Sequence, residues 1–257
     1  MIRVVIIGSG NVAQHLIAAF SKAHDSGSEV ELVQVYARQP ESLNSLVDFD
    51  TITSDLHELA EADLYIVAIS DDAIAEFSSS LPFKNRLVVH TSGSLPLEAL
   101  NDNNRKGVFY PLQTFSKTRE VDFRSIPIAL ESQNPTDFQL LEKVARKISE
   151  HVHAINSIQR KALHVSAVFV NNFSNHLYDI ANDVCDEHQV SFEILKPLIM
   201  ETAEKVMTLT PKEAQTGPAK RRDNNTIESH LALLTDENQK AIYNLLTHSI
   251  QIHEEKL

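Results

Sequence analysis

The chain has 257 residues, 42% of them hydrophobic, with only six Gly and nine Pro, so it is long enough for two modest globular domains and lacks the composition of a disordered protein. Its formal net charge of −12 argues against nucleic acid or an anionic membrane as a partner, because both require a basic surface. A single cysteine, Cys185, permits no intramolecular disulfide, and no His/Cys cluster has zinc-site spacing. The N-terminal apolar run, VVII, is too short for a signal peptide or a membrane span. We therefore expect a cytoplasmic protein that acts on a small molecule without a bound metal.

Strand and helix patterns alternate through the first half of the chain. Short apolar, β-branched runs predict strands, and segments with apolar residues at helical spacing predict helices. The predicted strands are 3–8, 31–37, 51–53, 64–70, 86–92, 106–112, 126–132 and 151–156; the predicted helices are 11–24, one through the 40s, 54–62, 71–81 and about 137–150. Such alternation indicates a parallel, doubly wound sheet. After Ser157 the β-branched runs stop, so we expect an α/β chain with a Rossmann domain over 1–157 and an all-helical domain over 158–257.

A glycine-rich turn joins the first predicted strand to the first predicted helix. Its sequence is GxGxxA: Gly8, Ser9, Gly10, Asn11, Val12 and Ala13. In this setting the first glycine permits a tight turn, the second lets a pyrophosphate approach the backbone, and the small third residue lets helix and strand pack closely. The helix N-terminus then offers free N–H groups to the anion. The turn predicts a dinucleotide site; the alternative is a βα turn that binds nothing.

The second predicted strand ends in Arg38 and Gln39, where an NAD-binding protein usually has an acid. An acid there holds the adenosine ribose, whereas an arginine can pair with the 2′-phosphate of NADP. We therefore predict NADP. The alternatives are a solvated Arg38 with Glu41 as a displaced ribose ligand, which would favour NAD, and FAD, which is disfavoured because its ribose also usually requires an acid.

Two more loops follow predicted strands at their C-terminal ends, where an open α/β sheet binds its ligand. Ser70 and Asp71 lie in the first, and we expect them to brace the cofactor ribose. Thr91 and Ser92 lie in the second, next to His90, and we expect them at the nicotinamide end. The alternative for these residues is turn and helix-cap chemistry, since Asp72 and Ser92 are also good N-cap residues.

The helix that starts near Arg160 has one polar face. Projected at about 100° per residue, this face carries Lys161, His164, Val168, Asn172, Asn175 and Asp179. It is rich in Asn and His, whereas exposed helices are usually coated by Glu and Lys. We therefore expect it to line a cleft; the alternative is a solvated face.

A basic cluster, Lys220 to Arg222, lies in the loop TGPAKRRD between two helical segments. In an acidic protein such a cluster favours an anionic substrate group or the cofactor phosphates, although a solvated charge run is the alternative. We predict that His90, Gln113, Arg221 and Asp223 bind substrate.

Along nearly its whole length the chain resembles bacterial proteins that pair an NADP-binding Rossmann-like domain with a C-terminal domain of unknown function called DUF2520. The matching segments are IGSGNVAQHL, VYAR, HTSGS, FYPLQTFS, KALHVSAVFVNNF and QTGPAKRRDNNTIESHL. More distantly it is similar to pyrroline-5-carboxylate reductase, ketopantoate reductase and the 6-phosphogluconate dehydrogenase superfamily, whose helical domains supply dimer contacts and a catalytic Lys or Asn.

This resemblance implies a homodimer through the helical domain. Lys161 and His164 match the Lys-x-x-His of the 6-phosphogluconate enzymes, but Val165 stands where those enzymes have Asn. Within TGPAKRRD, Arg221 and Asp223 match the family pattern, and Arg222 occupies a place usually held by Gly.

The sequence favours an NADP-dependent oxidoreductase that transfers hydride to or from a C=O or C=N centre in a cleft between the domains. Lys161 or His164 is the predicted proton donor, and Asn172 the predicted hydrogen-bond partner of the reacting atom. The alternative is a non-catalytic NADP(H) sensor, because a fold alone does not establish catalysis.

Overall fold

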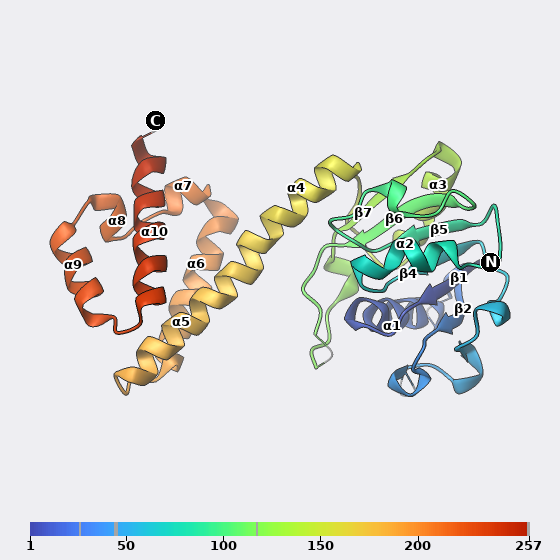
Figure 1. The fold of residues 1–257 in the computed structure, drawn as a ribbon, viewed down its shortest axis with the longest axis horizontal. Coiled ribbons are helices and arrows are strands. Elements are labelled where there is room, and N and C mark those ends of the chain that lie inside the picture. Colours follow the sequence, from blue (N-terminus) through green and yellow to red (C-terminus); the bar gives the residue numbers. More distant parts are fainter. Residues whose placement is uncertain (26, 44–45, 117, 256–257) are drawn as a thin grey trace. The chain divides into compact units, whose positions relative to one another are not determined.

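The computed structural model describes residues 1–25, 27–43, 46–116 and 118–255, and its contacts divide the chain into two compact units, Met1–Asn171 and Asn172–Leu257 (Figure 1). The division falls after Asn171, whereas the sequence placed it after Ser157. The reason is helix α4 (Ser157–Ala167), which is fastened to the sheet of the first unit by the buried side chain of Arg160.

The first unit contains an eight-stranded sheet in the order β3-β2-β1-β4-β5-β6-β7-β8. The strands are β1 (Ile2–Ile7), β2 (Val30–Tyr36), β3 (Ile52–Thr53), β4 (Leu64–Val67), β5 (Leu87–His90), β6 (Arg105–Pro111), β7 (Ile128–Ser132) and β8 (Val152–Ala154). Neighbouring strands are parallel except β6 and β7. A parallel crossover usually needs a covering helix, and the described residues of the β6–β7 connection form only the 3₁₀ turn Phe123–Ser125; the chain returns antiparallel. The predicted α/β fold is confirmed.

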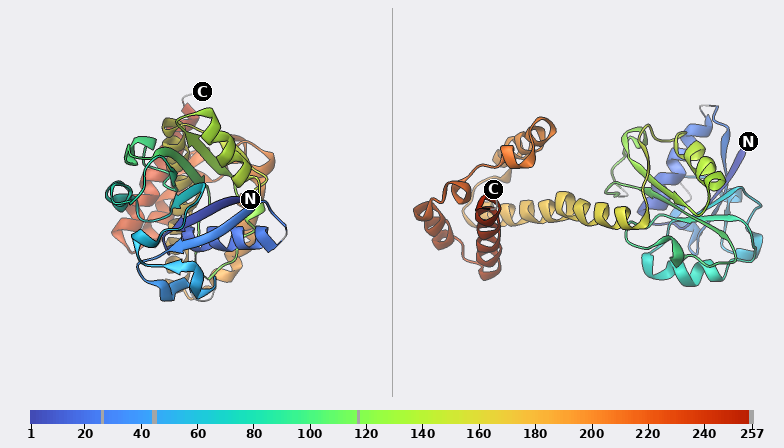
Figure 2. Two further views of the ribbon diagram at one scale, coloured as in Figure 1. Left: turned by 90° about the vertical axis from the view of Figure 1, so that its right-hand side faces the viewer. Right: turned by 90° about the horizontal axis from the view of Figure 1, so that it is seen from above.

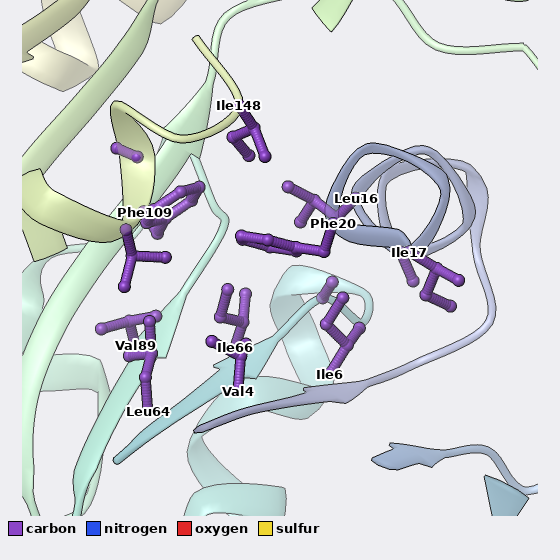
Figure 3. Packing of buried hydrophobic residues seen from close by; sticks show 14 of the residues in the cluster. Val4, Ile6, Leu16, Ile17, Phe20, Leu64, Ile66, Val89, Phe109 and Ile148 are labelled. Atoms are coloured by element: carbon purple, nitrogen blue, oxygen red, sulfur yellow. The ribbon is translucent and has the colours of Figure 1, made fainter. Parts of the chain in front are cut away.

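Helices cover both faces of this sheet. Helices α1 (Asn11–Asp25) and α3 (Pro135–Ala145) share one apolar core with the strands, and α2 (Asp71–Ser79) packs into a second core on the opposite face. Figure 3 shows the first core, where Phe20 of α1 lies among Phe109, Ile66 and Leu16. Burying a side chain of this size contributes about 1.5–3 kcal/mol, and these contacts fix α1, and so the glycine turn before it, against β1.

Two helices predicted between β2 and β4 are wrong. In place of a helix through the 40s the structure has the 3₁₀ turns Pro40–Leu43 and Phe49–Thr51, with residues 44 and 45 outside the described part. In place of a helix over 54–62 it has only the 3₁₀ turn Leu56–Glu58. Here a side chain forms hydrogen bonds with backbone groups that would otherwise pair within a helix. The Tyr65 hydroxyl donates to Ala60 O and accepts from the Ala62 N–H.

The second unit is helical throughout its described residues, as predicted (Figure 2). Its helices are α5 (Ser174–Glu187), α6 (Lys196–Thr208), α7 (Pro211–Ala214), α8 (Pro218–Arg221), α9 (Asn224–Leu233) and α10 (Glu237–Glu255), with the 3₁₀ turn Phe192–Leu195 before α6. In the part of the chain that the structure describes, no helix has both the length and the apolar content needed to cross a bilayer.

A π-helical turn, Val168–Phe173, separates α4 from α5. Each i→i+5 bond spans one residue more than an i→i+4 bond, so residues after one such turn are rotated by about 100° from a straight projection. The polar stripe predicted from Lys161 to Asp179 assumed an unbroken α-helix. It therefore does not continue along one face beyond this turn.

Candidate active site

A cleft of about 950 Å³ lies at the C-terminal ends of β1, β2 and β4. Among the predicted cofactor-binding residues, those that line it are Gly8, Ser9, Gly10, Asn11, Val12, Arg38, Ser70 and Thr91. The fold thus brings four separate loops of the sequence, those after β1, β2, β4 and β5, to one site. In a doubly wound sheet, ligands bind at this edge, outside the C-terminal ends of the strands.

The two glycines of the turn differ in their surroundings. Gly8 has φ +130°, and a Cβ there would come within 2.2 Å of Ala68 O, so this position accepts no side chain. A Cβ added to Gly10 would meet no described atom within 4 Å, and Gly10 lines the cleft. Ala13 is fully buried against the sheet, as its small size predicted. Gly8 is therefore required by the geometry of the turn, and Gly10 leaves space in the cleft for a ligand.

Helix α1 begins at this turn and has no acidic residue in its first turn, so its N-terminus suits an anion. The Asn11 side chain donates to Phe115 O at 2.8 Å. That bond ties the loop after β6 to the start of α1.

At the other end of the cleft Arg38 and Gln39 follow β2 directly. Arg38 is exposed, and the rings of Tyr36 and Phe77 lie nearby with their centroids 5.6 Å apart. This end therefore combines an aromatic surface, suited to a planar base, with a guanidinium suited to a phosphate. Glu41, the alternative ribose ligand, is exposed and does not line the cleft.

The loop after β5 is ordered by its own side chains. His90 is fully buried; its Nδ1 accepts from the Ser92 N–H at 3.1 Å, and its Nε2 donates to Pro96 O at 3.3 Å. Burial, aided by the charge of Arg160, lowers the pKa of His90 to about 4. With both ring nitrogens engaged, His90 shapes the loop and has no nitrogen left for the substrate contact that the sequence predicted.

Ser92 and Asp71 contact each other and do not line the cleft. The Ser92 hydroxyl donates to Asp71 Oδ2 at 2.7 Å and accepts from the N–H groups of Ser94 and Leu95. Ser92 therefore stabilises its own turn, which was the alternative to cofactor binding in the sequence analysis. The pair braces the loop against the start of α2 next to Thr91.

His164 of α4 lies directly over this loop. Its Nδ1 is 3.1 Å from the Tyr110 hydroxyl, and a Cβ on Gly93 would come within 2.6 Å of the same nitrogen. Burial raises the pKa of Tyr110, with the charge of Asp71 acting in the same direction and that of Arg160 against it. Tyr110 is the penultimate residue of β6, so the histidine lies at the C-terminal edge of the sheet. Gly93, which it covers, is two residues after Thr91 of the cleft.

Arg160 is fully buried one turn before His164. It forms an ion pair with Glu131 of β7 and also donates to Leu95 O, while the Ser157 hydroxyl and N–H both bond the Glu131 carboxylate. Sequence reasoning missed Arg160, Glu131 and Tyr110. The sequence showed only that Tyr110 and Glu131 lie in the predicted strands 106–112 and 126–132, and that Arg160 lies at the start of a predicted helix.

Family models match both parts of the chain. The model described as NADP oxidoreductase, coenzyme F420-dependent, matches residues 3–93, and the model of the domain of unknown function DUF2520 matches residues 126–250. The solved structure of BF3122 from Bacteroides fragilis, provisionally described as an NADP oxidoreductase, is 41% identical over 97% of this chain and 98% of that chain, with a TM-score of 0.87. The chain belongs to this family of NADP oxidoreductases with a DUF2520 domain. The predicted enzyme class and cofactor are confirmed.

Other solved structures share the fold of this NADP oxidoreductase. An imine reductase from Myxococcus stipitatus in complex with NADP⁺ is 13% identical over 97% of this chain and 91% of that chain, with a TM-score of 0.64. A pyrroline-5-carboxylate reductase from Coxiella burnetii is 14% identical over 99% and 98%, with a TM-score of 0.57. A comparison with curated proteins found no match.

The cleft fits the cofactor of the family. Open space at Gly10 and the N-terminus of α1 suit a pyrophosphate, and Arg38 at the aromatic end suits a 2′-phosphate. When bound, NADP(H) supplies the hydride chemistry.

The remaining predicted residues of the oxidoreductase are not gathered at this cleft within the first unit. Lys161 is exposed on α4, and Gln113 is exposed on the loop after β6 with its Oε1 accepting from the Thr114 N–H. Asn172, Arg221 and Asp223 belong to the second unit. Asp223 is the N-cap of α9: its carboxylate accepts from the Thr226 N–H and hydroxyl, and these bonds hold the pKa of Asp223 below its usual value.

Proposed function

We propose that this oxidoreductase transfers hydride between NADP(H) and the carbon of a C=O or C=N group in a small substrate. The observation that carries the proposal is the meeting of His164 and Tyr110 over Gly93, in the loop whose Thr91 lines the cofactor cleft. A titratable side chain beside the C-terminal edge of the sheet is in reach of a substrate that faces the nicotinamide.

In this proposal Arg38 pairs with the 2′-phosphate, and Gly8 to Ala13 hold the pyrophosphate, with Ser70, Asp71, Thr91 and Ser92 shaping the rest of the cofactor site. Lys161 or His164 gives the proton to the substrate oxygen or nitrogen as the carbon accepts the hydride, so that charge and atoms balance. Asn172 is proposed as a hydrogen-bond partner of that atom, and Gln113, Arg221 and Asp223 as substrate contacts. Each assignment extends the sequence prediction, which the geometry supports most strongly for His164.

The names of the proteins that share the fold guide the choice of test substrates. Two of these proteins, an imine reductase and a pyrroline-5-carboxylate reductase, are named after substrates that contain a C=N bond. Cyclic imines come first, therefore, followed by ketoacids and aldehydes as the C=O class.

The test is a turnover screen of the full-length protein with NADPH and with cyclic imines, ketoacids and aldehydes, which represent the C=N and C=O classes. With an active substrate, His164→Leu or Lys161→Met should lower kcat by about 10²–10⁴-fold, the usual contribution of a positioned acid or base, while NADPH affinity stays close to wild type. Lys84→Met, which changes an exposed lysine of the first unit that does not line the cleft, is the matched control. If NADPH binds but no substrate of either class is turned over, the sensor alternative is favoured.

A further inference from the structure

Tyr110 is a buried residue one position before the end of β6, and its hydroxyl has one hydrogen-bond partner among the described residues, His164 Nδ1 at 3.1 Å. The two rings meet edge to face, with their centroids 6.1 Å apart and their planes at 73°. The pair joins two segments 54 positions apart in the chain. No residue assignment made from the sequence included Tyr110.

The direction of this hydrogen bond follows from the chemistry of the two groups. Burial raises the pKa of Tyr110, so the hydroxyl keeps its proton. The O–H of a buried tyrosine requires an acceptor, and Nδ1 is the one it faces. A neutral imidazole that accepts at Nδ1 carries its proton on Nε2.

Nε2 of His164 makes no hydrogen bond to any described residue, and the side chain is only partly buried. The protonated nitrogen, Nε2, is thus the one without a hydrogen-bond partner among the described residues. His90, a few residues from Gly93, differs in this respect because both of its ring nitrogens are engaged.

Two further contacts hold the pair in place. Gly93 lies beneath it, where an added Cβ would come within 2.6 Å of His164 Nδ1 and 2.9 Å of Tyr110 Cζ. The buried ion pair of Arg160 with Glu131 fastens α4 one turn before His164. The imidazole is therefore fixed from the strand, the loop and its own helix.

We propose that Tyr110 is a positioning residue that holds His164 in its Nε2–H tautomer, with this N–H as the hydrogen-bond donor to the oxygen or nitrogen of the substrate C=O or C=N group. The role toward substrate rests on the proposed function. As the carbon accepts hydride, the electron pair of the double bond moves onto the heteroatom, and an N–H aimed at that atom stabilises the developing charge. A neutral imidazole is able to polarise a carbonyl in this way. The proton that completes the reduction then comes from Lys161, the other proposed donor.

The first test is nitrogen NMR of ¹⁵N-histidine-labelled full-length protein at about pH 8.5, two units above the ordinary histidine pKa of about 6.5. The signals of His164 are assigned by their loss in His164→Gln. In wild type they should be widely separated, with Nε2 protonated and Nδ1 an acceptor. In Tyr110→Phe they should move toward each other as both tautomers become populated. Tyr65→Phe, which removes another buried hydroxyl bonded at a different place in the sheet, should leave them unchanged.

Gly93→Ala is a second variant that keeps every functional group. Gly93 does not have a positive φ, so only the clash of the new methyl group with His164 and Tyr110 is at issue. It should shift the His164 signals as Tyr110→Phe does. Unchanged His164 signals in Tyr110→Phe, or a wild-type His164 protonated on Nδ1, would overturn the proposal.

The second test uses a substrate identified in the turnover screen. Tyr110→Phe should lower kcat by about 10–100-fold, less than the loss of His164 itself, with NADPH affinity unchanged. A normal kcat in Tyr110→Phe would overturn the role toward substrate. The NMR result does not depend on turnover, so a protein with the predicted tautomer but no activity on either substrate class would refute the proposed function and leave the tautomer assignment standing.

Discussion

Arg38 lies in the loop after β2 and lines the cleft together with Tyr36 and Phe77. If it pairs with the 2′-phosphate, Arg38→Ala should weaken NADPH binding by roughly 1.5–3 kcal/mol, the range for hydrogen bonds to charged groups, and leave NADH binding nearly unchanged. Isothermal titration with both nucleotides measures the difference. Arg146→Ala, in an exposed pair with Glu142 on α3, is the control. Equal losses for the two nucleotides would remove Arg38 from the phosphate site.

The two cleft glycines should separate folding from binding. Gly8→Ala places a Cβ against Ala68 O and strains a φ of +130°, so it should lower the melting temperature. A Cβ at Gly10 would meet no described atom within 4 Å, so Gly10→Val should fold normally while its side chain blocks the pyrophosphate and abolishes binding of both nucleotides. Thermal unfolding and nucleotide titration on both variants give the comparison. Wild-type affinity in a folded Gly10→Val protein would contradict the dinucleotide site.

Residues of the cleft could be predicted where a local motif carries the chemistry, as for Gly8, Gly10 and Arg38. Tyr110 and the Arg160–Glu131 pair could not, because their roles arise from contacts across 54 and 29 positions of the chain. His90 shows the reverse case. Its place after a strand is typical of a ligand-binding residue, and only the structure shows that burial and two local hydrogen bonds engage the ring.

Helix α4 depends on one buried ion pair. Removing one partner of such a pair leaves an uncompensated charge, so Arg160→Met should lower the free energy of unfolding by about 3–5 kcal/mol. Arg160→Met with Glu131→Gln should recover part of that loss, since the remaining carboxamide is neutral. Arg124→Met breaks an exposed pair with Glu150 and should cost only about 0–1 kcal/mol. Urea unfolding followed by circular dichroism measures all three; equal effects of Arg160→Met and Arg124→Met would show that α4 does not depend on this pair.

At the level of elements, periodicity predicted the strands well, most clearly β1 and β4, which are continuous runs of mostly apolar residues with most positions buried in the sheet. It failed over 54–62, where Tyr65 and Gln34 bond the backbone of Ala60, and at the turn Val168–Phe173, whose π winding changes the helical phase. Neither cause is visible in a pattern that assumes 3.6 residues per turn.

The second unit exposes much of its apolar surface. Among its described residues only Ala219 and Ile227 are buried hydrophobics, whereas Ile194, Leu198, Met207 and Leu245 are more than 60% exposed. Contiguous surfaces of this kind usually mark an interface. The segment SFEILKPLIMETAEKVMTL, from which the sequence predicted a dimer, supplies three of these four residues.

We therefore predict a homodimer formed through the second unit, with a second copy of this chain covering these side chains. Light scattering of the full-length protein should give twice 28.8 kDa at micromolar concentration. Met207→Glu with Leu245→Glu should shift the mass toward 28.8 kDa, because two buried acids on each side of the interface are costly to desolvate. The same change at the exposed Phe49 of the first unit should leave the dimer intact. NADPH affinity should persist in the separated chains, since the residues lining the cofactor cleft all belong to the first unit, and a wild-type protein that scatters as a monomer would refute the assembly.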